Sequence, residues 1–175
     1  MIDAKTLTLA AVMGALLAVI TFLLGPQWAA ATHLPGGVLI IPVSAAIVAT
    51  VLMLGARLGA TLTLTTWAFL LAPTPAIGFA PGLHKLIPAL VTGLVDDALW
   101  PLLPKGRRAL ILGGVHTAFM WAVIVASFVV FGLPAFKFVQ NSVFTALAAV
   151  DVIAGSLISG LICREIIKRV GVGTC

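Results

Sequence analysis

The side chains that can do chemistry in this 175-residue chain are few, and most of them stand in apolar surroundings. Only five residues are acidic and three are histidines. Two carboxylates, Asp96 and Asp97, are adjacent in LVDDALW, and a third, Asp151, lies in TALAAVDVIAGS. Carboxylates in apolar segments can carry a proton, bind a cation or accept a hydrogen bond from a ligand. The sequence contains no GxSG-like turn, no HExxH motif and no phosphate-binding GxxxxGK loop, so we do not expect an enzyme.

Asp96 and Asp97 are a poor catalytic pair, because neighbouring positions on a helix point about 100° apart. One interpretation pairs them with basic residues at the inner rim, with Arg57 for one carboxylate and Lys105 or Arg107 for the other. The second interpretation makes them a proton or cation site, or a contact that senses a cytoplasmic partner. Both interpretations remain open at this point.

Asp151 is expected near the middle of the last apolar segment, where no sequence neighbour can neutralise it. His116 lies at a comparable depth in the preceding segment, so a buried pair between Asp151 and His116 would satisfy both side chains. Alternatively, Asp151 faces a water-filled pocket and binds a ligand amine or ring N–H.

Several polar and aromatic residues are expected at the outer boundary of these segments. His33, His84 and Lys85 are either solvated interfacial side chains or, together with Trp28 and Asn141, the lining of an outer pocket.

Two deeper tryptophans, Trp67 and Trp121, can stack on a flat ligand or pack in the core. The three histidines lack the spacing of a metal cluster, so we expect neither a metal site nor a cofactor.

Long apolar segments must position these residues. The chain is 62% hydrophobic and only 9% charged, with a mean hydropathy of +1.24, whereas soluble domains carry about 25% charged residues. The apolar runs are continuous rather than alternating, and each approaches the ~20 residues that cross a bilayer as a helix. The sequence therefore predicts an all-α, multi-pass integral protein of the cell membrane, with a single transmembrane domain over residues 1–175.

The breaks between the apolar runs carry Gly and Pro, as at Gly25-Pro26, and predict a bundle of six transmembrane helices. The connection at 72–85 is rich in Pro and Gly, and we expect it to be irregular or partly re-entrant. The six expected spans are 5–25, 37–55, 58–78, 84–103, 109–132 and 141–166.

The distribution of cationic residues predicts the orientation. If both termini are cytoplasmic, eight Lys and Arg residues lie on the inner side and only Lys85 and Lys137 on the outer side, as the positive-inside rule requires. This topology explains the net charge of +5, so no nucleic-acid partner is expected. On the last helix, Glu165 and Arg169 are four residues apart and are expected to pair. The eight inner residues are Lys5, Arg57, Lys105, Arg107, Arg108, Arg164, Lys168 and Arg169.

Small residues form two rows on the first helix. Ala10, Gly14 and Ala18 make one row, and Ala11 and Ala15 belong to the next. Such rows let another helix approach closely. The approaching helix is either one of this bundle or one of a partner membrane subunit.

These features resemble the substrate-binding S components of energy-coupling factor (ECF) vitamin transporters. The segment Ala11-Val12-Met13-Gly14-Ala15 is similar to the family's Ala-x-x-x-Ala motif on the first helix. The turn MLGARLGA at 53–60 is similar to the family's LGP-x-x-GA turn between helices two and three, with Ala56 where Pro is common. In architecture the resemblance covers nearly the whole chain.

The resemblance implies a six-helix protein with cytoplasmic termini and a substrate pocket near the outer side, gated by residues 28–37 and walled by spans four to six. It implies docking of a transmembrane coupling subunit at Ala11, Gly14 and Ala15, and uptake driven by partner ATPases. The biotin-type Asp-x-x-Lys signature is absent from the last part of the chain, and the N-terminus lacks the Met-His of nickel and cobalt members. We therefore expect a largely neutral, ring-containing vitamin or precursor as the substrate.

Two other functions remain open from the sequence. One is a stand-alone proton- or ion-coupled carrier or channel, with Asp151, His116 and Asp96 along the path. The absence of an evident inverted repeat counts mildly against it. The other is a structural subunit of a larger membrane complex.

Overall fold

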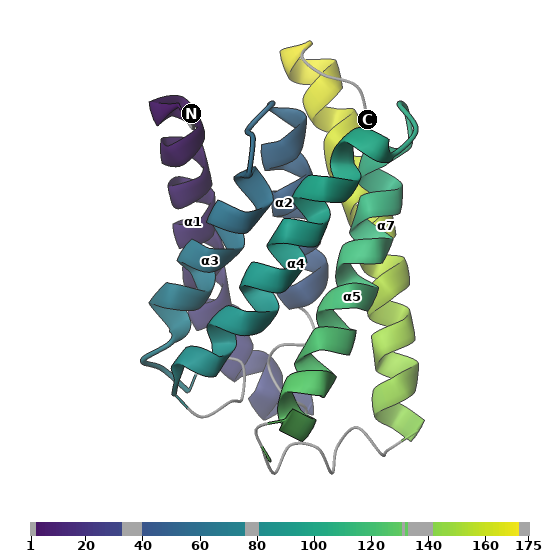
Figure 1. Cartoon of the computed structure of the whole chain (residues 1–175). Helices are drawn as coiled ribbons and strands as arrows, with labels where there is room; N and C mark the ends of the chain where they lie inside the picture. Colours follow the sequence, from purple (N-terminus) through teal and green to yellow (C-terminus); the bar gives the residue numbers. More distant parts are fainter. Residues whose placement is uncertain (1–2, 33–39, 76–80, 131, 133–141, 172–175) are drawn as a thin grey trace.

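The computed structural model describes residues 3–32, 40–75, 81–130, 132 and 142–171, which form an all-helical bundle (Figure 1). Two short 3₁₀ turns, η2 (Leu83–Lys85) and η3 (Trp100–Leu102), flank the fourth helix. The six helices of the described residues are α1 (Ala4–Thr32), α2 (Ile40–Met53), α3 (Gly59–Leu71), α4 (Leu86–Leu99), α5 (Arg108–Val130) and α7 (Ser142–Val170).

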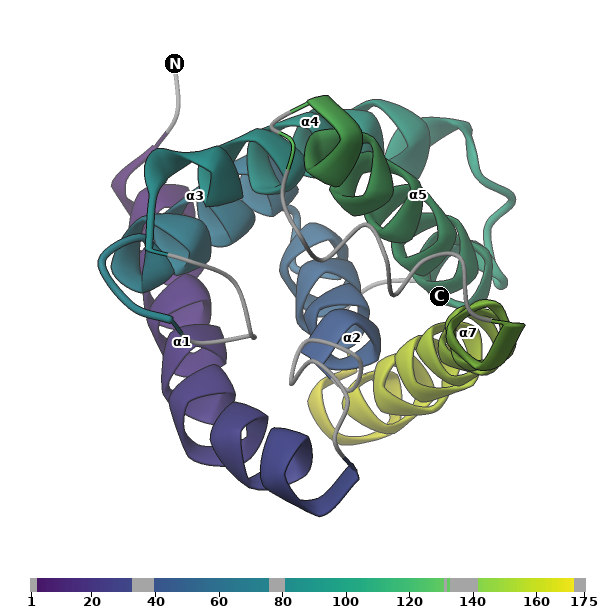
Figure 2. The same ribbon diagram turned by 90° about the horizontal axis from the view of Figure 1, so that it is seen from below.

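Helix α2 lies at the centre of the bundle. It contacts α1, α3, α5 and α7, and Figure 2 shows these helices arranged around it. Its sequence IIPVSAAIVATVLM is apolar on every side, and a helix of that kind is stable where all its faces are covered. The outer helices pack in pairs, α1 on α3, α3 on α4 and α5 on α7.

Three helical segments of the described chain are long and apolar enough to cross a membrane: Ala4–Gln27, Arg108–Ser127 and Thr145–Arg169. Helices α2 and α3 are shorter apolar helices. The outward faces of the long helices are also apolar, with Leu23 61% exposed on α1 and Leu161 64% exposed on α7. Apolar surface of this extent is typical of a protein that faces lipid.

The helix directions gather the cationic residues at one end of the bundle. Helix α1 begins and α7 ends at this end, as the N and C labels in Figure 1 show. The turn between α2 and α3 and the connection between α4 and α5 also lie there. We call it the basic end, because it carries the eight cationic residues predicted to share one side. Lys85 lies at the opposite end, in η2.

Two predicted helix ends were wrong. Helix α1 continues through Pro26 to Thr32, although Gly25-Pro26 was expected to end it. Proline removes one helical hydrogen bond, and the other backbone groups in apolar surroundings still need helical partners. Helix α3 ends at Leu71 rather than at residue 78. Ala72 still has helical backbone angles, but Pro73 has no N–H with which to continue the helical hydrogen bonds.

The row of small residues on α1 packs inside the bundle. Ala10 and Ala18 are buried, and a Cβ added to Gly14 would lie 2.5 Å from the backbone oxygen of Thr63 on α3. The absence of a side chain at position 14 therefore sets the distance between α1 and α3. Gly14 packs against α3 and is not available to a partner subunit, which corrects its assignment as a partner-docking residue.

Candidate functional site

The carboxylate of Asp96 is part of a buried polar chain that joins three helices. Its Oδ2 lies 2.6 Å from Nδ1 of His116 on α5, and Nε2 of that ring lies 2.8 Å from Oγ of Ser44 on α2. All three residues have no exposed surface. Oδ1 of Asp96 has no hydrogen-bond partner among the described residues. The sequence gives no reason to select Ser44, which is a single hydroxyl in an apolar helix.

The order Ser–His–Asp resembles a catalytic triad, but the hydrogen bond between Ser44 and His116 runs in the opposite direction. The Ser44 hydroxyl donates its only proton to the carbonyl oxygen of Ile41, at 2.7 Å. Nε2 of His116 therefore donates to Ser44, whereas a catalytic histidine accepts the serine proton. All three side chains are also buried. Their geometry therefore suits a hydrogen-bonded cross-link between α2, α4 and α5 rather than nucleophilic catalysis.

Asp97 points to a different helix and caps it. Its Oδ1 accepts the backbone N–H of Ala60 at 3.1 Å, and its Oδ2 accepts the N–H and the hydroxyl of Thr61 at 2.9 and 2.6 Å. The first turn of a helix has N–H groups without helical acceptors. A carboxylate there accepts hydrogen bonds from them and also interacts favourably with the positive end of the helix dipole. The residue at the N-cap position, Leu58, supplies no side-chain cap.

These contacts correct two predictions. The inner-rim pairing of Asp96 and Asp97 with basic residues was wrong, because Asp96 binds His116 and Asp97 binds the start of α3. The pairing of Asp151 with His116 was also wrong. Oδ2 of Asp151 instead accepts the indole N–H of Trp121 at 3.1 Å, and this bond joins α7 to α5. The predicted pair of Glu165 and Arg169 is confirmed, at 3.0 Å.

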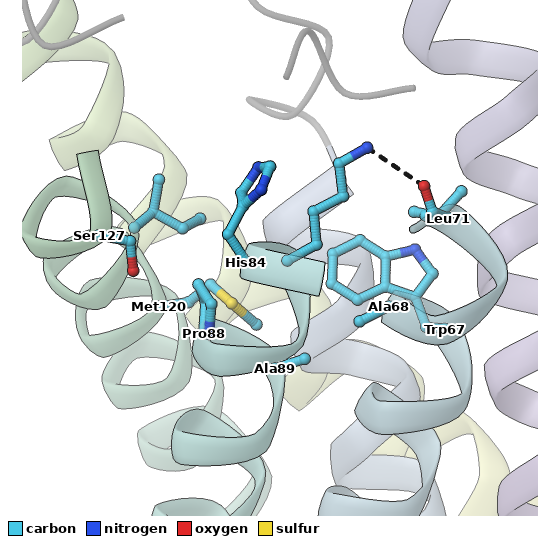
Figure 3. A pocket seen from close by; sticks show the side chains of 10 residues that line it. Trp67, Ala68, Leu71, His84, Pro88, Ala89, Met120 and Ser127 are labelled. Atoms are coloured by element: carbon cyan, nitrogen blue, oxygen red, sulfur yellow. Dashed lines mark hydrogen bonds between the residues drawn. The ribbon is translucent and has the colours of Figure 1, made fainter. Parts of the chain in front are cut away.

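A cavity opens at the end of the bundle opposite the basic end, between α3, η2, α4 and α5 (Figure 3). In Figure 3, His84 lies between Ser127 of α5 and Trp67 of α3. The cavity volume is about 40 Å³, room for a few water molecules. The lining residues are Trp67, Ala68, Leu71, His84, Lys85, Pro88, Ala89, Met120, Ile124 and Ser127.

Lys85 holds the cavity wall to the end of α3. Its ammonium donates to the carbonyl oxygen of Leu71 at 3.1 Å (Figure 3). It also donates to the carbonyl oxygen of Thr74. These carbonyls belong to the last turn of α3 and the residues after it, where a cation is favoured by the helix dipole. An ammonium has three N–H donors, and the contacts with the described residues use two of them.

Trp67 contributes both a ring face and a fixed orientation. Its indole N–H donates to the hydroxyl of Thr21 on α1 at 2.9 Å, and the Thr21 hydroxyl donates to the Leu17 carbonyl oxygen at 2.7 Å. The ring is therefore held by polar contacts behind it while it lines the cavity. Such an arrangement presents a rigid aromatic surface to a ligand.

The predicted site residues fall into separate groups. His84 and Lys85 line the cavity, whereas His116 belongs to the buried chain and Trp121 with Asp151 to the contact between α5 and α7. His33 and Asn141 lie outside the described residues, as does the side chain of Trp28.

Most residues of the cavity wall were not predicted from the sequence. Met120, Ile124 and Ser127 line it from α5, and their i, i+4, i+7 spacing is the signal that places them on one face. Two further residues, Pro88 and Ala89, line it from α4. Their residue types do not indicate that they line a cavity, because they are small or apolar and differ from other α4 residues only in orientation.

No protein-family model, curated protein or solved structure matches this chain. Among the residues that the structure describes, no group of three or more His, Cys, Asp or Glu side chains is placed to hold a metal ion.

Proposed function

We propose that the chain is the membrane-embedded substrate-binding subunit of an uptake system. In this proposal it captures a small vitamin-like molecule at the cavity end, and separate coupling and ATPase subunits supply the energy. The observation that carries the proposal is the cavity between Trp67, Lys85 and Ser127, which lies at the end of the bundle opposite the basic end. The resemblance of the first helix and of the turn at 53–60 to ECF S components agrees with this function.

The proposed topology places all six helices across the membrane with both termini in the cytoplasm. The basic end then faces the cytoplasm, as the positive-inside rule favours, and the cavity faces outward. Helices α2, α3 and α4 are shorter than ~20 residues, and each is covered on several sides by other helices of the bundle.

The lining of the cavity defines the class of ligand. Trp67 offers an aromatic face, Met120 and Ile124 offer apolar contacts, and Lys85 offers one N–H donor. These groups fit a flat, largely neutral ring that carries one hydrogen-bond acceptor. A cavity of about 40 Å³ is far below the roughly 300 Å³ of a typical ligand site, so capture has to widen it.

The proposed docking surface for a coupling subunit is the second row of small residues on α1. Ala11 is exposed and Ala15 is half-buried, so both are available to a partner helix. Close approach along small residues is a common way for membrane helices to associate.

The direct test is native mass spectrometry of the chain purified gently in detergent, followed by titration with a pool of water-soluble vitamins and their precursors. We expect one organic ligand at a one-to-one ratio. The variant Ser127→Leu fills the cavity and should weaken the binding of that ligand at least about tenfold, as a clash in a ligand site does. Ala126→Leu adds the same group on the exposed face of α5 and should bind normally.

Two outcomes would argue against this site. One is a ligand whose affinity is unchanged by Ser127→Leu. The other is a wild-type chain, purified with its partner subunits, that binds no member of the pool.

A second candidate, a stand-alone proton- or ion-coupled carrier, is supported by the buried Asp96–His116 pair. Ionisable residues inside a membrane are costly and often serve ion movement. This candidate predicts gradient-driven uptake by the purified chain alone in proteoliposomes, abolished by His116→Phe. The binding-subunit proposal predicts no uptake without partners. A third candidate, a structural subunit of a larger membrane complex, predicts neither ligand binding nor uptake by this chain.

A further inference from the structure

A second cavity lies at the basic end, between the start of α5 and the last turns of α7. Its volume is about 370 Å³, nearly ten times that of the cavity at the other end. Arg107 and Leu110 line it from one side, and Leu157, Leu161 and Arg164 line it from the other. We call it the α5–α7 groove.

The groove exists because α5 and α7 pack closely below it. A Cβ added to Gly113 would lie 2.3 Å from the Gly155 backbone oxygen, and the Ser156 hydroxyl donates to the Leu110 carbonyl oxygen at 2.7 Å. Gly160 lies one turn further along α7 and lines the groove, where its missing side chain leaves space beside Leu110.

The two arginines of the groove have no anionic partner in the described part of the chain. The side chain of neither Arg107 nor Arg164 forms a hydrogen bond or ion pair with the described residues. The adjacent charged residues are engaged elsewhere: Arg108 donates to the Leu103 carbonyl oxygen at 2.9 Å, and Glu165 pairs with Arg169. Among the described residues, no acidic side chain therefore compensates the positive charge in the groove.

The rest of the groove is apolar and faces outward. Leu110, Leu157 and Leu161 are 36%, 53% and 64% exposed. Leu157 and Leu161 are four residues apart, so they form a continuous strip along α7 that leads from Arg164 toward the middle of the bundle. The groove thus combines a cationic head with an apolar track.

We propose that the α5–α7 groove binds an anionic phospholipid, with its phosphate between Arg107 and Arg164 and one acyl chain along Leu157 and Leu161. Arginine forks recognise phosphate oxygens, and basic pockets between membrane helices on the cytoplasmic side hold anionic head groups. The N-terminus of the 23-residue helix α5 adds the favourable end of a helix dipole to the same place. Lipid binding in this groove does not depend on which ligand occupies the cavity beside Trp67 and Lys85.

The test measures retention of phosphatidylglycerol and of phosphatidylcholine with the same acyl chains by native mass spectrometry of the full chain. We expect at least about tenfold preference for phosphatidylglycerol, since each basic residue near an anionic lipid favours binding severalfold. The double variant R107Q/R164Q should lose this preference. The matched control K105Q/K168Q removes the same charge at the same end, outside the groove, and should keep it.

Equal loss of the preference in both double variants would overturn the proposal, because it would mean that net charge rather than the groove attracts the lipid. Retention of the wild-type preference in R107Q/R164Q would overturn it as well.

A second arm separates a lipid from a soluble phosphate. Leu161→Asn replaces an exposed apolar residue of the groove. It should weaken retention of phosphatidylglycerol by about fivefold, because part of the apolar contact between the leucine side chain and an acyl chain is lost. Glycerol 3-phosphate, which has the head-group chemistry without the chains, should not displace the lipid at equal concentration. Full displacement, together with no effect of Leu161→Asn, would assign the groove to a soluble anion and overturn the lipid proposal.

Discussion

At the scale of single residues, Asp97 does for α3 what an N-cap residue does for its own helix. Three donors of Ala60 and Thr61 converge on its carboxylate, although it belongs to α4. Removal of an N-cap side chain costs about 1–2 kcal/mol of stability. We therefore expect Asp97→Ala to lower the unfolding free energy by about that amount, measured by unfolding in mixed micelles.

The control for this prediction is Asp3→Ala. Asp3 caps α1 within its own helix, where its Oδ1 accepts the Thr6 N–H at 2.6 Å, and that hydrogen bond holds the pKa of Asp3 below its usual range. Asp3 is exposed at the chain end, so its loss should have a smaller effect. An equal or larger effect of Asp3→Ala would contradict the structural role of Asp97.

The buried pair of Asp96 and His116 predicts strong energetic coupling. Removing either partner leaves the other buried without its hydrogen bond, at a cost of about 3–5 kcal/mol. Removing both avoids most of that penalty, so Asp96→Leu with His116→Phe should be about 1–3 kcal/mol more stable than the sum of the single variants predicts.

The control for this double-mutant experiment combines Asp96→Leu with Trp121→Phe. Trp121 donates to Asp151, which is not one of the hydrogen-bonded residues Asp96, His116 and Ser44, so these two changes should add. Additivity of Asp96→Leu with His116→Phe would mean that the 2.6 Å contact contributes nothing to stability.

At the scale of helices, α1 uses its two rows of small residues differently. Gly14 touches the backbone of α3, and a larger residue there forces the helices apart. We expect Gly14→Leu to destabilise the protein by about 1–3 kcal/mol, the usual cost of overpacking, in the same unfolding assay.

Ala11→Leu is the matched change on the exposed row, and we expect it to leave stability unchanged. If Ala11 lies in the proposed docking surface, this variant should lose co-purification with a coupling subunit while it still binds ligand. Loss of stability in Ala11→Leu would show that the exposed row also has a structural role.

The helices themselves could be predicted from apolar runs and turn residues, but their exact ends depend on neighbours. Helix α1 passes Pro26, and α3 stops at Leu71 because Pro73 follows. The partners of the polar residues were not predictable from spacing, since Asp96 and His116 are brought together only by the packing of α4 against α5. Sequence alone identified His84 and Lys85 but could not orient Met120 or Ser127 toward them.

At the scale of the whole molecule, the basic end predicts a fixed orientation in the membrane. Helix α1 begins and α7 ends at that end, among the cationic residues. We expect a green fluorescent protein fused to either terminus to fluoresce in the cytoplasm, and alkaline phosphatase fused to either terminus to be inactive. Opposite results for the two termini would require an odd number of spans and would contradict the six-span proposal.

The cap that Asp97 provides also bears on how the chain enters the membrane during synthesis. Helix α3 has only 13 residues, about 20 Å, and the acceptor for its first turn is 37 residues further along the chain than Ala60. Until α4 has been translated, the start of α3 can find acceptors only in water or among lipid head groups. If α3 and α4 cross the membrane as proposed, we expect insertion of α3 to be completed together with α4, so that these two helices enter as a single hairpin after α1.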